Sequence, residues 1–342
     1  MNILQKILFG TAVLLLASCV KEQDNTQEGQ DVVITLDAGT RSSEPGATAD
    51  RYINSLRVLG YNSVSGQLSF NEKVDFTGSN ATNFQDIINV KTGTFTVVFI
   101  ANEHADPATS ALLNAIGSTS ATSNLAHIKG ISFSYGAFSA TKDIPMVKIK
   151  NSVHIKGDNL LSDPEINSGA DISTSWNVEL ERIGIRVDLT LKLTDAQKTA
   201  WQSGTHNGRV YLNNVPVKAY IFPGMDNSDV LLTGNEIFVS PTAASPAVVG
   251  GLNIFEYTRV ILPESIIKES NPATAKTKAL TLSLYEGATK RTGIINSGIA
   301  GYNSSLPRNL WVGVTATVKD DEVDFEIEVS SWTDKNMSQI LQ

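Results

Sequence analysis

Two runs of strictly alternating apolar and polar residues lie next to each other in the middle of the chain. In the first run, Trp176, Val178 and Leu180 alternate with polar residues. In the second, the apolar positions continue from Ile183 to Leu193, one residue out of phase. Strict alternation is typical of a strand with one buried face, and a one-residue shift reverses that face. We therefore expect one strand to close a first β-sandwich and the next to open a second; a bulge within one long strand is the alternative.

Strand patterns also fill much of the remaining sequence. Apolar residues alternate from Leu310 to Val318 and again from Val323 to Val329, which predicts a hairpin of two amphipathic strands. The run Phe95–Ala101 is apolar apart from one Thr and predicts a buried strand. Further strand candidates are residues 128–138, 144–155 and 215–222. The pattern favours an all-β fold made of β-sandwiches.

Few helices are expected. Asp106-Pro107 has the form of a helix start, because Pro is well tolerated in the first turn. Thr194 followed by Gln197 has the spacing of a capping box, and Gly204 is a suitable stop. Both predicted helices are short, so they do not change the fold class.

The N-terminus has the features of a lipoprotein signal peptide. Lys6 precedes a mostly apolar run from Ile7 to Ala17, about half the ~20 residues that a membrane-spanning helix needs. The sequence Leu-Ala-Ser before Cys19 resembles a bacterial lipobox. We expect residues 1–18 to be a signal peptide and Cys19 to carry acyl chains in the outer membrane. An ordinary signal peptide with an incidental Cys is the alternative.

Composition limits the possible partners. Cys19 is the single Cys in 342 residues, so internal disulfides are not expected and stability must come from hydrophobic burial. The net charge is −8, which argues against nucleic acid as a partner because phosphate binding needs a basic surface.

No motif predicts catalysis, a cofactor or a metal. The four histidines are scattered and lack the i, i+4 spacing of a metal pair: His104, His127, His154 and His206. Neither a G-x-S-x-G elbow nor a Gly-rich phosphate loop is present. We expect a protein that is not an enzyme. A glycosidase stays open, because its carboxylates need no fixed spacing in sequence.

The order of features resembles the fimbrillin family of Bacteroidota, the subunits of type V pili. A lipobox Cys, a polar tether and a short strand precede a loop that contains Arg41. The pattern Ile-x-x-Leu-Arg-Val then occupies 53–58, Leu-x-Arg-x-x-x-x-Val occupies 180–187, and Val-Asp-Phe-Glu-Ile-Glu-Val-x-x-Trp occupies 323–332.

The resemblance implies two transthyretin-like β-sandwich domains in tandem. We place the lipidated tether at 19–31, the N-terminal domain at 32–180 and the C-terminal domain at 181–342. The first strand would cover 32–38 and a processing loop 39–51. The family also implies donor-strand exchange, in which an Arg-specific protease cuts the loop, the first strand leaves, and a strand from another subunit fills its groove.

Residues of this chain are assigned to that scheme as follows. The cut is expected between Arg41 and Ser42, with Arg51 as the nearest alternative. The displaced strand would carry Val32, Ile34 and Leu36. The candidate donor is the terminal strand with its tail, and its apolar positions are Val323, Phe325, Ile327 and Val329.

The expected partners are other fimbrial subunits, the protease, outer-membrane lipid and a host or bacterial surface ligand. After processing the subunit would lie in the fimbrium, whereas an uncut anchor would stay on the membrane. A surface glycan-binding lipoprotein is the main alternative, with exposed aromatics as its sugar platform. Its candidates are Tyr61, Tyr135, Tyr211, Tyr257, Tyr302 and Trp311. A surface enzyme is a third, lower alternative.

Overall fold

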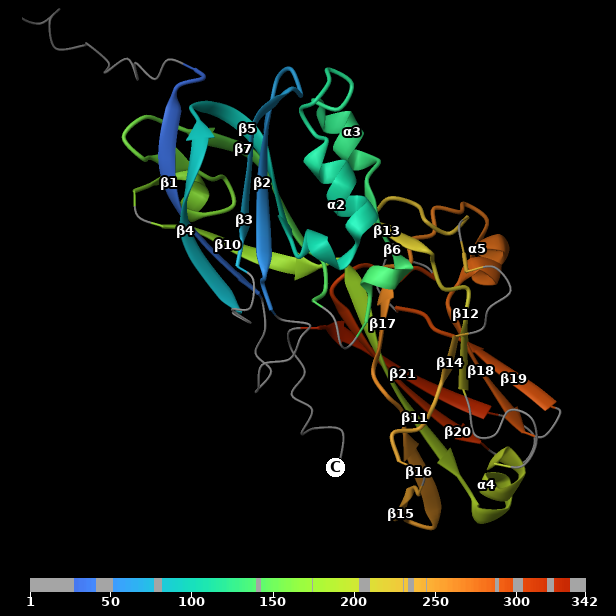
Figure 1. Cartoon of the computed structure of the whole chain (residues 1–342). Helices are drawn as coiled ribbons and strands as arrows, with labels where there is room; N and C mark the ends of the chain where they lie inside the picture. The colour runs from blue at the N-terminus through green and yellow to red at the C-terminus, as the bar shows by residue number, and fades with distance from the viewer. Residues whose placement is uncertain are drawn as a thin grey trace, which may run out of the picture.

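The chain is mainly β-structure with a few short helices (Figure 1). The computed structural model describes residues 28–40, 52–76, 82–139, 143–173, 175–202, 210–229, 231–232, 237–243, 245–286, 289–297, 304–318 and 323–332. The expected all-β class is confirmed. Within these ranges, no helix has the length and apolar character needed to cross a membrane.

The first lobe is built on a nine-stranded sheet whose main path is β3-β2-β5-β7-β10-β1-β4, with β8 and β9 attached through β7. The strands are β1 (Asp31–Thr40), β2 (Ser55–Asn62), β3 (Leu68–Asp75), β4 (Asn83–Lys91), β5 (Gly93–Ala101), β7 (Met146–Ile155), β8 (Leu161–Ser162), β9 (Asp171–Ile172) and β10 (Ser175–Arg182). The two ends of the path approach each other, because the rings of Phe76 and Phe84 lie 3.8 Å apart. The sheet thus curls around one apolar core.

The second lobe contains two sheets. One follows the path β15-β16-β11-β20-β21, with β17 paired to β11, and the other follows β14-β12-β18-β19. The strands of the first are β11 (Gly184–Leu193), β15 (Ala247–Val249), β16 (Leu252–Glu256), β17 (Val260–Pro263), β20 (Leu310–Val318) and β21 (Val323–Ser331). Those of the second are β12 (Val210–Asn213), β14 (Ile237–Val239), β18 (Thr281–Glu286) and β19 (Thr289–Ile294). Side chains from both sheets form a second core.

The out-of-phase runs in mid-chain are two strands in different sheets. β10 pairs with β1 and β7 in the first lobe, whereas β11 pairs with β16, β17 and β20 in the second. The buried residue Ile183 is the single residue between them. The shift in phase therefore marks the point where the chain passes from one lobe to the other.

A third apolar core joins the two lobes. It combines first-lobe residues such as Leu59 and Val98 with second-lobe residues such as Ile221 and Trp332. A two-stranded sheet also bridges the lobes, because β6 (Ser132–Ser134) pairs with β13 (Lys218–Tyr220). The lobes are thus in continuous contact through buried side chains and backbone hydrogen bonds.

The short helices largely follow the predicted signals. Asp106 caps α2 (Pro107–Asn114), and its carboxylate accepts hydrogen bonds from the backbone of Ala108 and Thr109. At α4 (Asp195–Gln202), the Thr194 and Gln197 side chains make the reciprocal bonds of a capping box. The remaining helices are α3 (Leu125–Lys129) and α5 (Pro272–Lys278), with 3-10 turns at Glu103–Ala105, Tyr135–Ala137 and Asn167–Gly169.

The prediction of one strand over 128–138 was wrong. That segment holds the end of α3, the short strand β6 and a 3-10 turn. The side chain of Asn124 accepts a hydrogen bond from the backbone N–H of His127 and starts the helix. Ile128 and Ile131 are both buried, and their spacing of three fits a helical turn as well as a strand. These apolar residues are therefore buried, as expected, but the spacing between them does not belong to a strand.

Candidate assembly site around the first strand

β1 lies inside the first sheet rather than at its edge. It pairs in parallel with β10 from Thr35 to Thr40 and antiparallel with β4 from Asp31 to Gly39. The strand runs to Thr40, so Gly39 and Thr40, which were expected in the loop, are part of the ladder. β1 therefore closes the gap between two strands that do not pair with each other in the described sheet.

The inward side chains of β1 are all aliphatic, and the last of them, Ala38, is the smallest. Ile34 and Leu36 are buried in the first core, as is the smaller Ala38, while Val32 packs at its border. Burying one large aliphatic side chain contributes roughly 1.5–3 kcal/mol. Removing the strand would therefore expose a row of apolar pockets that any replacement would have to fill.

Trp176 of β10 lies beside β1 and is fully buried. Its neighbour across the β1–β10 ladder is Leu36. The indole N–H donates to Asp163 at 2.9 Å, and the same carboxylate lies 3.2 Å from the ammonium of Lys150. The ring meets Phe99 edge to face at a centroid distance of 4.9 Å. One wall of the β1 slot is thus held by polar contacts that do not involve β1.

β4 forms the other wall, and it depends on β1. Among the described strands, β4 pairs with β1 and with no other. Ile87 of β4 and Val33 of β1 are 60% and 41% exposed, and both side chains lie on the outer face. The inner face of β4 contributes Ile88 and Val90 to the core. β1 is consequently the link that keeps β4 in the sheet.

The sequence patterns did not predict these two walls. Trp176 was identified as a strand residue from its alternation, but nothing in the sequence indicates that β10 lies beside β1. Asp163 precedes a Pro in a loop and carries no local signal of its role. The apolar–polar alternation of the β4 sequence is broken at Asp86 and Ile87, although burial alternates from residue 83 to residue 90. Only the tertiary pairing identifies all three as parts of the slot.

The predicted processing and lipidation residues have no described structure. Cys19, Arg41 and Ser42 all lie outside the described residues. The last described residue before Arg41 is Thr40, whose backbone N–H donates to the carbonyl of Thr82 at 3.1 Å. The roles of these three residues stay predictions.

The candidate donor strand is an edge strand of the second lobe. β21 pairs with β20 at nine positions, from Val323 to Ser331. Val323, Phe325, Ile327 and Val329 are partly buried and pack on the second core. The next residue, Trp332, is 1% exposed and stacks with the guanidinium of Arg182 at 4.6 Å. Residues 333–342 of the tail lie outside the described residues.

Several aromatic residues considered for sugar binding are buried. Tyr61, Tyr257 and Trp311 belong to the apolar cores. Tyr135 and Tyr211 are half-buried, and Tyr302 lies outside the described residues. Buried rings cannot offer a face to a sugar, so Tyr61, Tyr257 and Trp311 do not form an exposed platform.

One Ser–His–Asp arrangement is present in the first lobe. Ser55 Oγ lies 3.3 Å from His104 Nδ1, and His104 Nε2 lies 2.9 Å from an Asp143 carboxylate oxygen. A nucleophilic hydroxyl needs access to substrate, and Ser55 is 2% exposed. The contacts instead tie the start of β2 to the segment before β7. No cluster of three or more potential metal ligands occurs in the part of the chain that the structure describes.

The fold and the slot define a two-lobed, all-β protein in which β1, the first of the described strands, fills a gap inside the N-terminal sheet. Residues 31–182, which run from β1 to the end of β10, match the family described as major fimbrial subunit protein (FimA). The resemblance to fimbrillins is therefore confirmed over residues 31–182. No curated protein sequence matches the chain.

Solved structures of fimbrial proteins share the fold. The tip fimbrial protein Mfa3 from Porphyromonas gingivalis, with a C-terminal truncation, matches with a TM-score of 0.59 and 15% identity, covering 89% of this chain and 100% of that one. A fimbrilin (fimA) from Porphyromonas gingivalis W83 matches with a TM-score of 0.52 and 12% identity, covering 89% and 98%. The likeness thus extends over both lobes.

Proposed function

We propose that this chain is a structural subunit of a cell-surface fimbria of the type V class, contributing to adhesion. In this proposal it is exported as a lipoprotein precursor acylated at Cys19. An Arg-specific protease then cuts between Arg41 and Ser42, β1 leaves, and a strand from another subunit enters the slot.

The position of β1 is the single observation that carries the proposal. Its side chains are part of the core, yet it is the first of the described strands and Arg41 follows it directly in the sequence. A cut in that loop would leave β1 held by non-covalent contacts alone. An incoming strand can restore the same two ladders and fill the same pockets, which is β-augmentation.

The domain boundary that we propose, near 180–181, fits this scheme. All strands that line the slot come before it, so the acceptor is contained in one domain. The proposed donor, Val323 to Gln342, belongs to the other domain. A subunit of this kind can accept a strand at one end and donate a strand at the other.

The decisive experiment treats the purified precursor with an Arg-specific protease. We expect a new N-terminus at Ser42 and a ladder of oligomers on a non-boiled gel. Arg41→Ala should block both, whereas Arg51→Ala is the matched control and should assemble like the unmodified chain. Cleavage at Arg41 without oligomers would contradict the exchange mechanism, and resistance to cleavage would point to an uncut anchor.

Two deletions separate the parts of the proposed donor. Removing Asn336–Gln342 tests the tail alone, and unchanged polymerisation would exclude those residues from the mechanism. Removing Val323–Gln342 also takes away β21 and its contacts with the second core. Folding of that variant must therefore be checked by circular dichroism before its loss of polymerisation is interpreted.

A further inference from the structure

The inward side chains of β1 meet different surroundings along the strand. Ile34 and Leu36 are large and buried, whereas Ala38 is small and has no exposed surface at all. Across its two ladders, Ala38 is paired with Phe84 of β4 and Val178 of β10. Directly opposite residues of an antiparallel pair have Cβ atoms about 4.5–5.5 Å apart. A small side chain therefore lies between two larger ones at this position.

Phe84 is held beside the slot by a contact that does not involve β1. Its ring lies 3.8 Å from the ring of Phe76, which directly follows β3. The backbone N–H of Phe76 donates to the carbonyl of Asn54 at 2.8 Å. Val178 is buried and belongs to β10, which is also paired with β7. Both neighbours of Ala38 would therefore stay beside the slot when β1 leaves.

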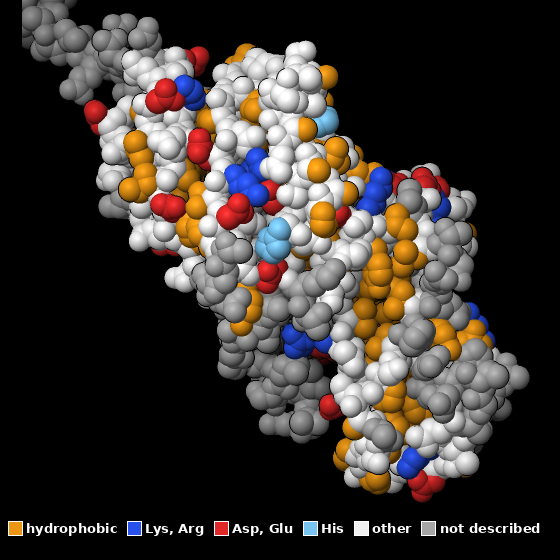
Figure 2. All heavy atoms as spheres, in the orientation of Figure 1, with side chains coloured by type: hydrophobic (Ala, Val, Ile, Leu, Met, Phe, Trp, Pro, Cys, Tyr) orange, Lys and Arg blue, Asp and Glu red, His pale blue; other side chains and the backbone are white. Residues whose placement is uncertain are grey.

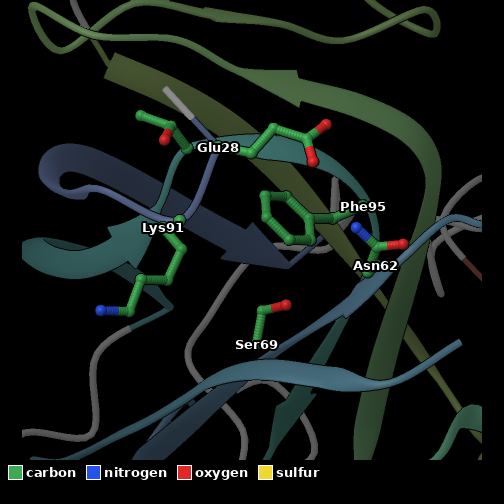
Figure 3. A pocket seen from close by; sticks show the side chains of 7 residues that line it. Glu28, Asn62, Ser69, Lys91 and Phe95 are labelled. Atoms are coloured by element: carbon green, nitrogen blue, oxygen red, sulfur yellow. The ribbon is translucent and has the colours of Figure 1, made fainter. Parts of the chain in front are cut away.

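The start of the slot is more open than the Ala38 end. A pocket of about 290 Å³ lies there, and Figure 3 shows the side chains of Glu28, Ser69, Lys91 and Phe95 around it. Glu28 precedes β1 and would leave with it, which would open this end further. The size of an incoming side chain is therefore restricted at Ala38 and not at the start of β1.

The outer face of the slot places few limits on an incoming strand. Val33 and Ile87 are exposed on this face. A Cβ atom added to Gly39 would meet no described atom within 4 Å beyond its chain neighbours. Figure 2 shows apolar, acidic and basic side chains side by side on the first lobe. Outward side chains of several kinds, charged ones included, can therefore be accommodated.

We propose that the slot selects its occupant by side-chain size at the position of Ala38. The strand that replaces β1 needs large apolar residues where Ile34 and Leu36 lie, and a small residue two positions later. This inference rests on the proposed function and deepens it, since it states which strand sequence the slot accepts. A larger residue at the Ala38 position has to displace the Phe84 ring or shift the strand, and such overpacking is destabilising.

The proposed donor contains this pattern once. Large apolar residues at Ile327 and Val329 are followed two positions later by Ser331, and no other part of the donor has this order of sizes at this spacing. Aligned with β1 in the same direction, these three residues take its inward positions, with Ser331 in place of Ala38. Asn336–Gln342 then lie beyond the end of the slot, so their deletion should leave polymerisation unchanged.

β21 reaches another copy by leaving its own sheet. It is an edge strand, and β20 is its one ladder partner among the described strands. Its inward residues are only partly buried in the second core. Trp332 leaves the core between the lobes in the same step and takes the outward position of Gly39. One ladder is broken, and the slot of the next copy supplies two ladders in exchange.

The first test uses the uncut precursor and does not depend on assembly. Ala38→Leu should lower the free energy of unfolding in urea, because the larger side chain meets the Phe84 ring. Phe84→Ala should make room for the leucine, so the double variant should lose less stability than the two single variants together. Additive losses would show that Phe84 does not limit size at this position and would overturn the inference.

The second test compares ladder formation after protease treatment. Ser331→Leu should slow it by about tenfold or more, because the leucine would occupy the Ala38 position. Ser331→Ala keeps a small side chain and should cause a much smaller delay. Ser330→Leu is the matched control and should also cause a much smaller delay, because its side chain lies on the outer face in the proposed register. Circular dichroism and the thermal midpoint of each uncut variant check that the second lobe is intact.

A rescue variant locates the contact between the copies. Adding Phe84→Ala to Ser331→Leu should restore faster ladder formation, because the shortened side chain leaves room for the leucine. Normal ladders from Ser331→Leu, or an equal delay with Ser330→Leu, would overturn the inference and leave the proposed function standing. Absence of ladders from the unmodified chain would contradict the proposed function, and the inference with it.

Discussion

At the scale of single residues, a buried ion pair lies beside α2. The guanidinium of Arg57 donates to both carboxylate oxygens of Glu103, at 2.7 and 3.0 Å. The two side chains are 4% and 1% exposed. Arg57 also donates to Asn71 and Asn114, and Lys73 lies 3.1 Å from Glu103. Each charge is paired, so the network fixes β2 against the 3-10 turn that contains Glu103.

Breaking this pair should be costly. Arg57→Leu leaves the Glu103 carboxylate buried without its main partner, and we expect a loss of about 3–5 kcal/mol in the free energy of unfolding. Lys91→Ala is the control, because the Lys91–Asp31 pair is partly exposed and such pairs contribute about 0–1 kcal/mol. Urea unfolding of both variants measures the difference. Equal losses would contradict the structural role of Arg57.

The same network predicts that the free energy of unfolding depends on pH. Burial by itself raises the pKa of Glu103, but hydrogen bonds and the charges of Arg57 and Lys73 outweigh it and hold the pKa below its ordinary value of 4.5. Folding therefore favours the charged form. The stabilisation is complete above that ordinary value and is lost as the pH falls through the lower folded pKa. Urea unfolding from about pH 7 down to about pH 3 should show this loss, with a smaller slope for Glu103→Gln.

At the scale of elements, the sheet around β1 combines a strong and a weak attachment. β10 is fixed by Trp176 and by the ladder to β7, whereas β4 is attached to the described sheet through β1. Loss of β1 would therefore affect the two walls differently. β10 keeps its neighbour β7, and β4 loses its ladder partner until another strand replaces β1.

Substitutions on the inner and outer faces of β1 should change the free energy of unfolding by different amounts. Leu36→Ala leaves a cavity in the core and should lower the free energy of unfolding of the uncut chain by about 2–5 kcal/mol. Val33→Ala is the control on the outer face, where Val33 is 41% exposed, and should change it by at most about 0.5 kcal/mol. Chemical unfolding of the uncut precursor provides the measurement. A large effect of Val33→Ala would contradict the observed strand register.

At the scale of the whole molecule, the core between the lobes couples them. Trp332 comes from the end of β21, yet it packs with first-lobe residues and stacks on Arg182 of β10. The β6–β13 pair adds backbone hydrogen bonds across the same junction. A pulling force that enters one lobe is therefore passed to the other through packed side chains as well as through the chain itself.

Trp332→Ala should weaken this coupling. Truncating a buried Trp typically costs about 3–5 kcal/mol. We expect one calorimetric transition for the unmodified chain and two separated transitions for the variant, because the lobes would then unfold independently. Leu112→Ala, on the exposed side of α2, should keep the single transition. A single transition at a lower midpoint for Trp332→Ala would show that the lobes stay coupled without the indole.

The sequence by itself determined several of the strands and their buried faces. Alternation at Trp176–Leu180 and Ile183–Leu193 indicated two strands and the point of change between them, because side-chain period follows directly from strand geometry. Asp106 and Thr194 marked helix starts, because caps act over a few neighbouring residues. The prediction of a strand at 128–138 was wrong, because a spacing of three between apolar residues also fits a helical turn.

Tertiary structure alone decided which strands are neighbours. No local signal places β10 parallel to β1 or brings Asp163 to the indole of Trp176, because such pairings depend on the packing of distant segments. The same holds for Trp332. The sequence pattern places it at the end of a terminal strand, but in the structure it lies in the core between the lobes. The slot around β1 is therefore a product of long-range pairing, whereas the strand that fills it can be recognised from residues 32–38 alone.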